Sequence, residues 1–81
     1  MTAQTKLAVV TGAAQGIGRR TAEVLAAEGY ALILNDVQSC AEVVAAVRAI
    51  GPEAVEVDGD ISEEAVARAI AQSAGSHFGR V

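Results

Sequence analysis

Three glycines at the spacing Gly-x-x-x-Gly-x-Gly are the residues whose type and placement most clearly indicate chemistry. They are Gly12, Gly16 and Gly18, between an apolar run and a helix-like stretch. Gly12 would allow a sharp turn out of a strand, Gly16 would let the backbone approach a phosphate, and Gly18 would let helix and strand pack closely. The following helix would offer unpaired N–H groups and a partial positive charge to a pyrophosphate. The loop therefore predicts a dinucleotide site.

The spacing argues against two other phosphate-binding loops. The Gly-x-x-x-x-Gly-Lys loop would need its second glycine where Ile17 stands, and the common Gly-x-Gly-x-x-Gly fingerprint would need a glycine at Ala14. A glycine-rich turn with no ligand is the alternative. The strand before this loop, the helix after it and an acidic residue further on favour the nucleotide site.

That acidic residue is Asp36, which ends an apolar run 18 residues beyond Gly18. A carboxylate at this position can accept hydrogen bonds from the adenosine ribose hydroxyls, and it repels a 2′-phosphate. Val37 follows it and offers no positive charge to neutralise such a phosphate. The pair favours NAD over NADP, and a solvated carboxylate at a strand end is the alternative.

Three apolar, β-rich runs alternate with three helix-like stretches, and these elements must hold the residues above in place. Each run predicts a buried strand, and each stretch carries a stripe with helical spacing. The first helix should stop at Gly29, which can take a positive φ. The expected strands cover residues 6–11, 30–34 and 54–57. The stripe of the first helix is Ile17, Thr21, Val24 and Leu25.

The second and third helices carry their own boundary signals. Ser39 and Glu42 have the spacing of a capping box, in which the serine accepts from a first-turn N–H and the glutamate reaches back. Ser62 is expected to cap the third helix, and a fourth strand would begin within 78–81. The expected stripes are Val43, Val44, Val47 and Ile50 in the second helix, which Gly51 and Pro52 should end, and Val66, Ala69, Ile70 and Ser73 in the third.

Strand–helix alternation at this spacing predicts βαβ units and a parallel sheet covered on both faces. Right-handed crossovers place the first two helices on one face and give the strand order 3-2-1, with the third helix on the opposite face. We therefore expect an α/β fold. It would be the first half of a Rossmann-like doubly wound parallel sheet, with the element order β-α-β-α-β-α.

Composition excludes several other classes of protein. The chain has 81 residues, a net charge of −4 and scattered arginines, so it lacks the basic patch that nucleic acid or an anionic membrane needs. No apolar run is long enough to span a membrane, and we expect that the polar N-terminus is not a signal peptide. The single cysteine, Cys40, cannot form an internal disulfide, which fits a cytoplasmic setting. Strand alternation and helix starts explain the acidic residues within 53–64, so no metal is expected.

The chain resembles the compact, single-domain branch of the short-chain dehydrogenase/reductase family over essentially its whole length. The family loop Thr-Gly-x-x-x-Gly-Ile-Gly is matched by 11–18, and Asp36 matches the NAD-selecting acid of the family. Asp60, Ile61 and Ser62 resemble the motif after the third strand, whose aspartate and following backbone N–H hold the adenine. Residues 78–81 resemble the run that leads into the fourth strand.

The resemblance implies NAD(H), in preference to NADP(H), as the cofactor. It also implies an oxidoreductase that transfers hydride between the nicotinamide and a secondary alcohol or carbonyl. Candidate substrates are 3-oxoacyl thioesters, sugars, polyols and steroids, and the parent protein is expected to be a homodimer or homotetramer. The implied cofactor-binding residues are Gly12, Gln15, Gly16, Ile17, Gly18, Asp36, Val37, Asp60 and Ile61.

No catalytic residue can be assigned within these residues. The family uses a Tyr-x-x-x-Lys pair and a serine, with the tyrosine as general acid and base. The one tyrosine, Tyr30, is followed four residues later by Leu34, and the one lysine, Lys6, precedes the first strand. We therefore expect residues 1–81 to be the N-terminal NAD-binding part of a single Rossmann-fold domain, a fragment without the C-terminal catalytic part. A non-catalytic nucleotide-binding or interaction module is the alternative.

Overall fold

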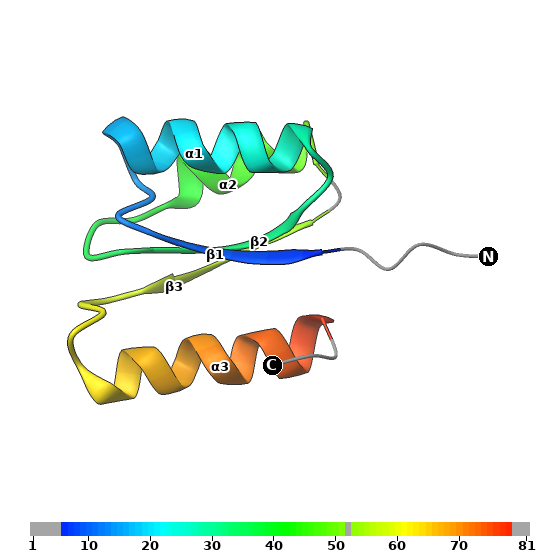
Figure 1. Ribbon diagram of the computed structural model, residues 1–81. Coiled ribbons are helices and arrows are strands. Elements are labelled where there is room, and N and C mark those ends of the chain that lie inside the picture. The colour runs from blue at the N-terminus through cyan, green and yellow to red at the C-terminus, as the bar shows by residue number, and fades with distance from the viewer. Residues whose placement is uncertain (1–5, 52, 79–81) are drawn as a thin grey trace.

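Three strands and three helices alternate along the chain in the computed structural model (Figure 1). The structure describes residues 6–51 and 53–78, with side chains described as far as residue 75. The elements are β1 Leu7–Thr11, α1 Gly16–Ala27, β2 Ala31–Asp36, α2 Ala41–Arg48, β3 Ala54–Asp58 and α3 Glu64–Phe78. Residues 79–81, on which most of the expected start of a fourth strand falls, lie outside the described residues. Among the described helices, none has both the length and the apolar character to cross a membrane.

The strands form one parallel sheet with β2 in the middle, in the order β1-β2-β3. Ile33 of β2 pairs with Val9 of β1 on one side and with Val55 of β3 on the other. Helices α1 and α2 cover one face of the sheet, and α3 covers the other (Figure 1). The predicted α/β fold, its strand order 3-2-1 and the change of face at the third helix are confirmed.

Strand β2 is buried on both faces, which explains its unbroken apolar sequence. Leu32 and Leu34 point into the core shared with α1 and α2, whereas Ile33 points into a smaller core beneath α3. All three side chains are fully buried. Side chains alternate between the two faces of a strand, so only a strand with helices on both sides needs apolar residues at every position.

Helix α1 ends where it was expected to, but most of its apolar stripe is exposed. Gly29 follows the C-cap with φ +94°. Ile17 is 87% exposed and Val24 is 50% exposed, whereas Ala22 and Ala26 are buried in the core shared with α2 and the sheet, and Leu25 packs against that core. Together with Arg20, the stripe lines an open hollow of about 280 Å³ formed by Ile17, Arg20, Thr21, Val24 and Leu25.

Helix α2 buries three of its four expected stripe residues, Val43, Val44 and Val47. Ile50 lies beyond the last helical residue and is 51% exposed, so its expected place in the core is wrong. The capping box is half right. Ser39 Oγ accepts the Ala41 N–H at 3.2 Å, but Glu42 points to Arg19 of α1 instead of reaching back.

The N–H of Cys40, at the N-cap position of α2, bonds to a residue distant in sequence. It donates to the carboxylate of Glu56 on β3 at 2.9 Å. This contact joins the start of α2 to the neighbouring strand and satisfies a backbone donor that the helix cannot satisfy itself.

Helix α3 begins two residues after Ser62, so Ser62 is not its N-cap. The backbone N–H and the hydroxyl of Ser62 both donate to Asp60 Oδ1, at 2.9 and 2.7 Å. An aspartate carboxylate that accepts the N–H two residues later forms an Asx turn. Because residues 60–62 form this turn, the helix begins only at Glu64. The expected stripe is confirmed in place: Ile70 is buried, and Val66, Ala69 and Ser73 are half-buried.

We predict that Glu56→Ala lowers the free energy of unfolding by about 1 kcal/mol, because it leaves the Cys40 N–H without its partner. Glu56→Gln keeps an acceptor oxygen and should lose less. Urea unfolding of both variants, with the exposed Glu53→Ala as the control, checks this. Equal stability of Glu56→Ala and the unsubstituted protein would contradict the assignment.

Candidate nucleotide site

The glycine loop adopts the backbone that its spacing predicts. Gly12 turns out of β1 with φ +65°, and Gly16 has φ +63°. A Cβ on Gly18 would lie 1.9 Å from the carbonyl oxygen of Gly12, so only glycine permits this close packing of loop and helix. A Cβ on Gly16 would meet nothing within 4 Å. Gly16 therefore opens onto free space, as an approach to a phosphate requires.

The N-terminus of α1 has no competing anion of its own. Its N-cap, Gln15, is extended and makes no side-chain cap hydrogen bond, and the first turn contains no acidic residue. The first N–H groups of a helix have no partner within the helix and carry a partial positive charge. This helix end can therefore accept an anionic group from outside the chain.

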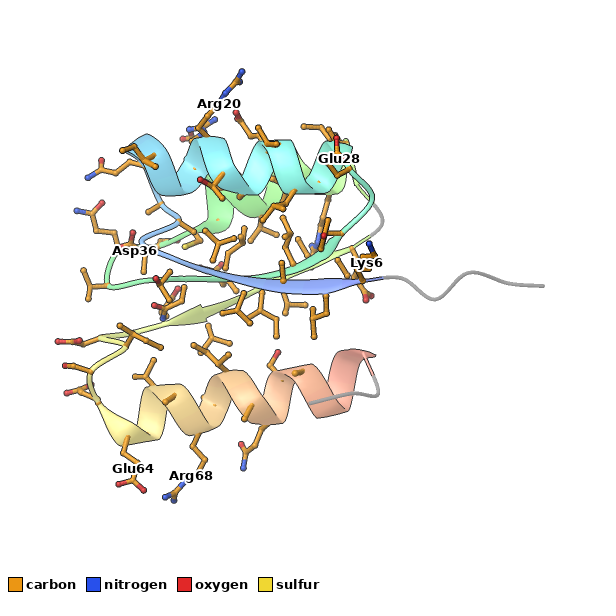
Figure 2. The ribbon with its side chains drawn as sticks, viewed as in Figure 1. Lys6, Arg20, Glu28, Asp36, Glu64 and Arg68 are labelled. Atoms are coloured by element: carbon orange, nitrogen blue, oxygen red, sulfur yellow. The ribbon has the colours of Figure 1, made fainter. Side chains whose placement is uncertain are left out.

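Asp36 lies at the end of the sheet where α1 and α3 begin (Figure 2). Its carboxylate bonds to the glycine loop, since Oδ2 accepts the Ala14 N–H at 3.0 Å. Oδ1 accepts the Gln38 N–H, also at 3.0 Å. The hydrogen bonds from Gln38 and Ala14 stabilise the charged form and hold the pKa of Asp36 below its ordinary value.

A hollow of about 190 Å³ lies at this end of the sheet. It brings together five of the predicted residues, because Gly12, Asp36, Val37, Asp60 and Ile61 all line it. The other four predicted residues, Gln15, Gly16, Ile17 and Gly18, lie next to it in the loop and first turn of α1 and do not line it.

Asp60 and Ile61 form the wall of the hollow that follows β3. The hydrogen bonds from the Ser62 hydroxyl and N–H lower the pKa of Asp60, so this carboxylate is charged at neutral pH. Ile61 is 44% exposed and presents an apolar side chain at the rim. An acidic group beside an apolar surface suits a base that carries both N–H donors and a flat face.

A family model described as short chain dehydrogenase matches residues 6–81. The chain belongs to the short-chain dehydrogenase family. It spans about 30% of the length of the curated relatives that it matches.

Relatives of this short-chain dehydrogenase chain include cis-4-hydroxycyclohexanecarboxylate dehydrogenase from Sinomonas cyclohexanicum. The two are 43% identical over 75 residues, which are 91% of this chain and 30% of the relative.

Two solved structures are similar along nearly the whole chain. One is a short-chain dehydrogenase/reductase from Burkholderia phymatum in complex with NAD, with TM-score 0.87 and 41% identity over 96% of this chain and 28% of that one. The other is L-sorbose reductase from Gluconobacter frateurii complexed with NADPH and L-sorbose. Its TM-score is 0.85, with 32% identity over 94% of this chain and 30% of that one.

Asn35 is the residue of this site that sequence reasoning missed. It is 2% exposed, and its side-chain amide donates to the carbonyl oxygens of Val57 and Gly59 at 2.8 and 3.1 Å. Asn35 also lines the hollow. Its position was a signal, because an amide directly after a continuous apolar run is expected to be buried and to need hydrogen-bond partners.

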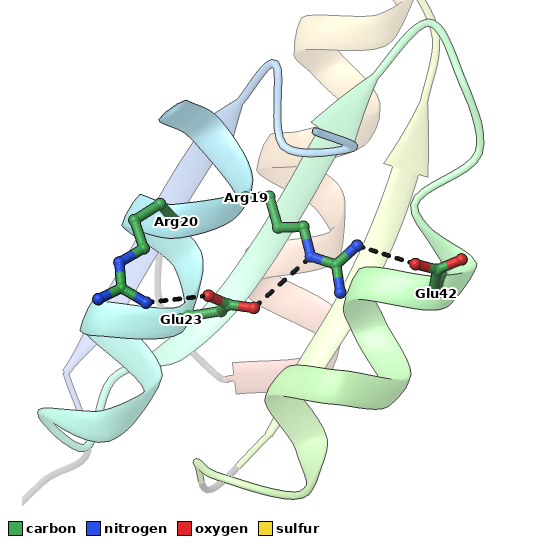
Figure 3. A network of polar contacts seen from close by, with 4 residues as sticks. All are labelled: Arg19, Arg20, Glu23 and Glu42. Carbon is green, nitrogen blue, oxygen red and sulfur yellow. Dashed lines mark hydrogen bonds and ion pairs between the residues drawn. The ribbon is translucent and has the colours of Figure 1, made fainter. Parts of the chain in front are cut away.

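The arginines that follow the loop are engaged in ion pairs (Figure 3). Arg19 bridges two helices, with its guanidinium 2.8 Å from Glu42 of α2 and 3.5 Å from Glu23 of α1. Arg20 lies 3.6 Å from the same Glu23. Neither arginine lines the hollow around Asp36, so their charges are directed to carboxylates of the helices.

Cys40, Glu56 and Asp58 place their sulfur and oxygen atoms within 4.8 Å of one another. Burial, together with the neighbouring carboxylates Glu56, Asp36 and Asp58, raises the pKa of the Cys40 thiol to about 11. The thiolate is the form that binds metals, and Glu56 is already occupied by the Cys40 N–H. The Glu56 carboxylate is thus engaged at the start of α2.

Lys6 and Tyr30 lie at the opposite end of the sheet from Asp36. Figure 2 shows Lys6 at that end, and Tyr30 directly precedes β2. The Lys6 ammonium stands 5.8 Å from the centre of the Tyr30 ring. The pair is thus a cation–π contact remote from the nucleotide site.

We predict that Gly18→Ala costs about 3 kcal/mol or more in the free energy of unfolding, because its Cβ overlaps the Gly12 carbonyl. Gly75→Ala is the matched control, since Gly75 lies in α3 with open space where a Cβ would be. It should stabilise the protein by about 0.5–1 kcal/mol. Urea unfolding measures both, and a loss below about 0.5 kcal/mol for Gly18→Ala would refute the close packing.

We predict that Asp36 contributes a pH-dependent part of the stability. Its pKa is lower in the folded chain, so the contribution is complete above the ordinary carboxyl pKa and is lost as pH falls through the lowered value. The difference in unfolding free energy between the unsubstituted protein and Asp36→Asn should be constant near neutrality and shrink below about pH 4. Urea unfolding at several pH values checks this, and a constant difference down to about pH 2 would contradict it.

Proposed function

We propose that this chain binds NAD(H), in preference to NADP(H), as the N-terminal nucleotide-binding part of a single Rossmann-fold oxidoreductase. The observation that carries the proposal is the placement of Asp36, whose carboxylate lies in the hollow beside the glycine loop. Val37 follows it, and none of the described residues lining the hollow is basic. A 2′-phosphate at this point would meet a charged carboxylate and no counter-charge.

The residues fit the parts of such a cofactor. The uncapped N-terminus of α1 and the open backbone at Gly16 would hold the pyrophosphate. Asp36 would hold the adenosine ribose, and Asp60 with Ile61 would border the adenine. A hollow of about 190 Å³ is smaller than the about 300–1,000 Å³ of sites for drug-sized ligands, so it suits the adenosine half alone.

The whole protein is proposed to act on a secondary alcohol or its carbonyl. A bound nicotinamide supplies or accepts the hydride, and the residues of this chain bind and orient the nucleotide. The relatives named above support this substrate class, because cis-4-hydroxycyclohexanecarboxylate carries a secondary alcohol and L-sorbose is a ketose. The candidates remain 3-oxoacyl thioesters, sugars, polyols and steroids.

The proposal also covers the cellular compartment and the oligomeric state of the whole protein. A cytoplasmic, reducing setting is supported by Cys40, the one cysteine of the chain, which is buried as a free thiol. The whole protein is proposed to be a homodimer or homotetramer, because the compact branch that the sequence resembles is oligomeric.

We predict that Asp36→Ala combined with Val37→Arg shifts the ratio of NADP to NAD affinity by about tenfold or more, or ~1.4 kcal/mol. The change removes the repulsion of the 2′-phosphate and adds a cation beside it. Calorimetric titration with both cofactors measures the ratio. The substitution also removes the Asp36 bond to Ala14, which should affect the binding of both cofactors alike. The ratio of the two affinities cancels this shared effect and reports the discrimination alone.

The matched control is Ala27→Arg combined with Glu28→Ala, which changes the net charge equally. Both residues are exposed at the C-terminal end of α1, and Figure 2 shows Glu28 there, remote from Asp36. This control should leave the ratio of affinities unchanged. Preference for NADP by the unsubstituted protein would overturn the proposal.

A further inference from the structure

We propose that Asn35 is a positioning residue for the nucleotide site, and that its side-chain amide sets the separation of the two walls of the hollow. The inference rests on the proposed function, because it concerns how that site is held open. Asn35 is the polar residue buried within the described part of the chain. Burying an amide is costly unless its hydrogen bonds are satisfied, so its partners define its role.

The amide spans the point where β3 stops. Register places Asn35 opposite Val57, and β3 ends one residue later at Asp58. The amide donates to the carbonyl oxygens on both sides of Asp58, at Val57 and Gly59, with distances of 2.8 and 3.1 Å. It therefore adds two side-chain hydrogen bonds at the point where the strand passes into the turn.

The turn that begins at Gly59 is held both by bonds to β2 and by bonds within the turn, such as those from Ser62 to Asp60. Gly59 has φ +125°, a backbone conformation that side chains disfavour, and its N–H donates to the Asp36 carbonyl at 2.9 Å. The two bonds from the Asn35 amide join this backbone bond at the end of β3. Two of these three bonds depend on one side chain.

The opposite wall is attached to the same two residues of β2. The Ala13 N–H donates to the Asn35 carbonyl at 2.9 Å, and the Ala14 N–H donates to Asp36 Oδ2 at 3.0 Å. The glycine loop and the turn after β3 are therefore both hydrogen-bonded to Asn35 and Asp36. Of the two walls, only the turn after β3 depends on the Asn35 side chain, because the Ala13 N–H of the glycine loop bonds to the Asn35 backbone carbonyl.

This difference provides the test. Asn35→Leu keeps the volume and removes both donors, so the turn at Gly59 should loosen while the glycine loop keeps its backbone bond. Amide hydrogen exchange, measured by NMR without nucleotide, should become at least tenfold faster at Gly59 relative to Ala13. A merely destabilised protein would accelerate both amides by the same factor.

Val47→Ala is the matched control for lost stability. Val47 is buried in α2 and does not line the hollow, so this variant should raise both exchange rates equally. An unchanged ratio of Gly59 to Ala13 exchange in Asn35→Leu would overturn the role of Asn35.

Binding is measured with two probes, AMP for the adenosine side and inorganic pyrophosphate for the helix end. Chemical-shift titration of Asn35→Leu should show AMP affinity at least tenfold weaker, and pyrophosphate affinity within about twofold of the unsubstituted protein. Equal loss for both probes, or loss for neither, would overturn the inference. Failure of the unsubstituted protein to bind AMP and NAD would instead overturn the proposed function, and the exchange ratio would still decide whether Asn35 holds the turn.

Discussion

Burial of β2 on both faces is the constraint on which the rest of the structure depends. A strand between two others, covered by helices above and below, cannot shift its register without exposing apolar side chains. The last two residues of β2, Asn35 and Asp36, are therefore fixed in space. Loops from both neighbouring strands bond to them, and the candidate site inherits its geometry from the most buried element of the fold.

The features that the sequence predicts well are those governed by local chemistry. A positive φ at Gly12 and Gly29 follows from glycine itself, and the alternation of strands and helices follows from apolar spacing. The carboxylate of Asp36 could be placed near the glycine loop because parallel strands end at one edge of a sheet. The first two features follow from neighbouring residues, and the third follows from the topology of a parallel sheet.

The features that the sequence does not predict depend on partners distant along the chain. Glu56 bonds the start of α2 from another strand, 16 residues away, so no capping pattern could reveal it. Ile17 and Val24 have the spacing of a buried stripe, yet the buried residues of α1 are Ala22 and Ala26. Asn35 finds its acceptors 22 and 24 residues further on.

The alanines beneath α1 have a mechanical consequence. A helix of 12 residues is a rod about 18 Å long, and its height above the sheet is set by the side chains beneath it. Ala22 and Ala26 lie in its middle and at its C-terminal end, whereas the glycine loop is fused to its N-terminal end. A larger side chain at either alanine would tilt the helix. The tilt would displace its N-terminal end, where the phosphate is expected. The small size of these two side chains thus helps to set the position of a binding surface that neither of them contacts.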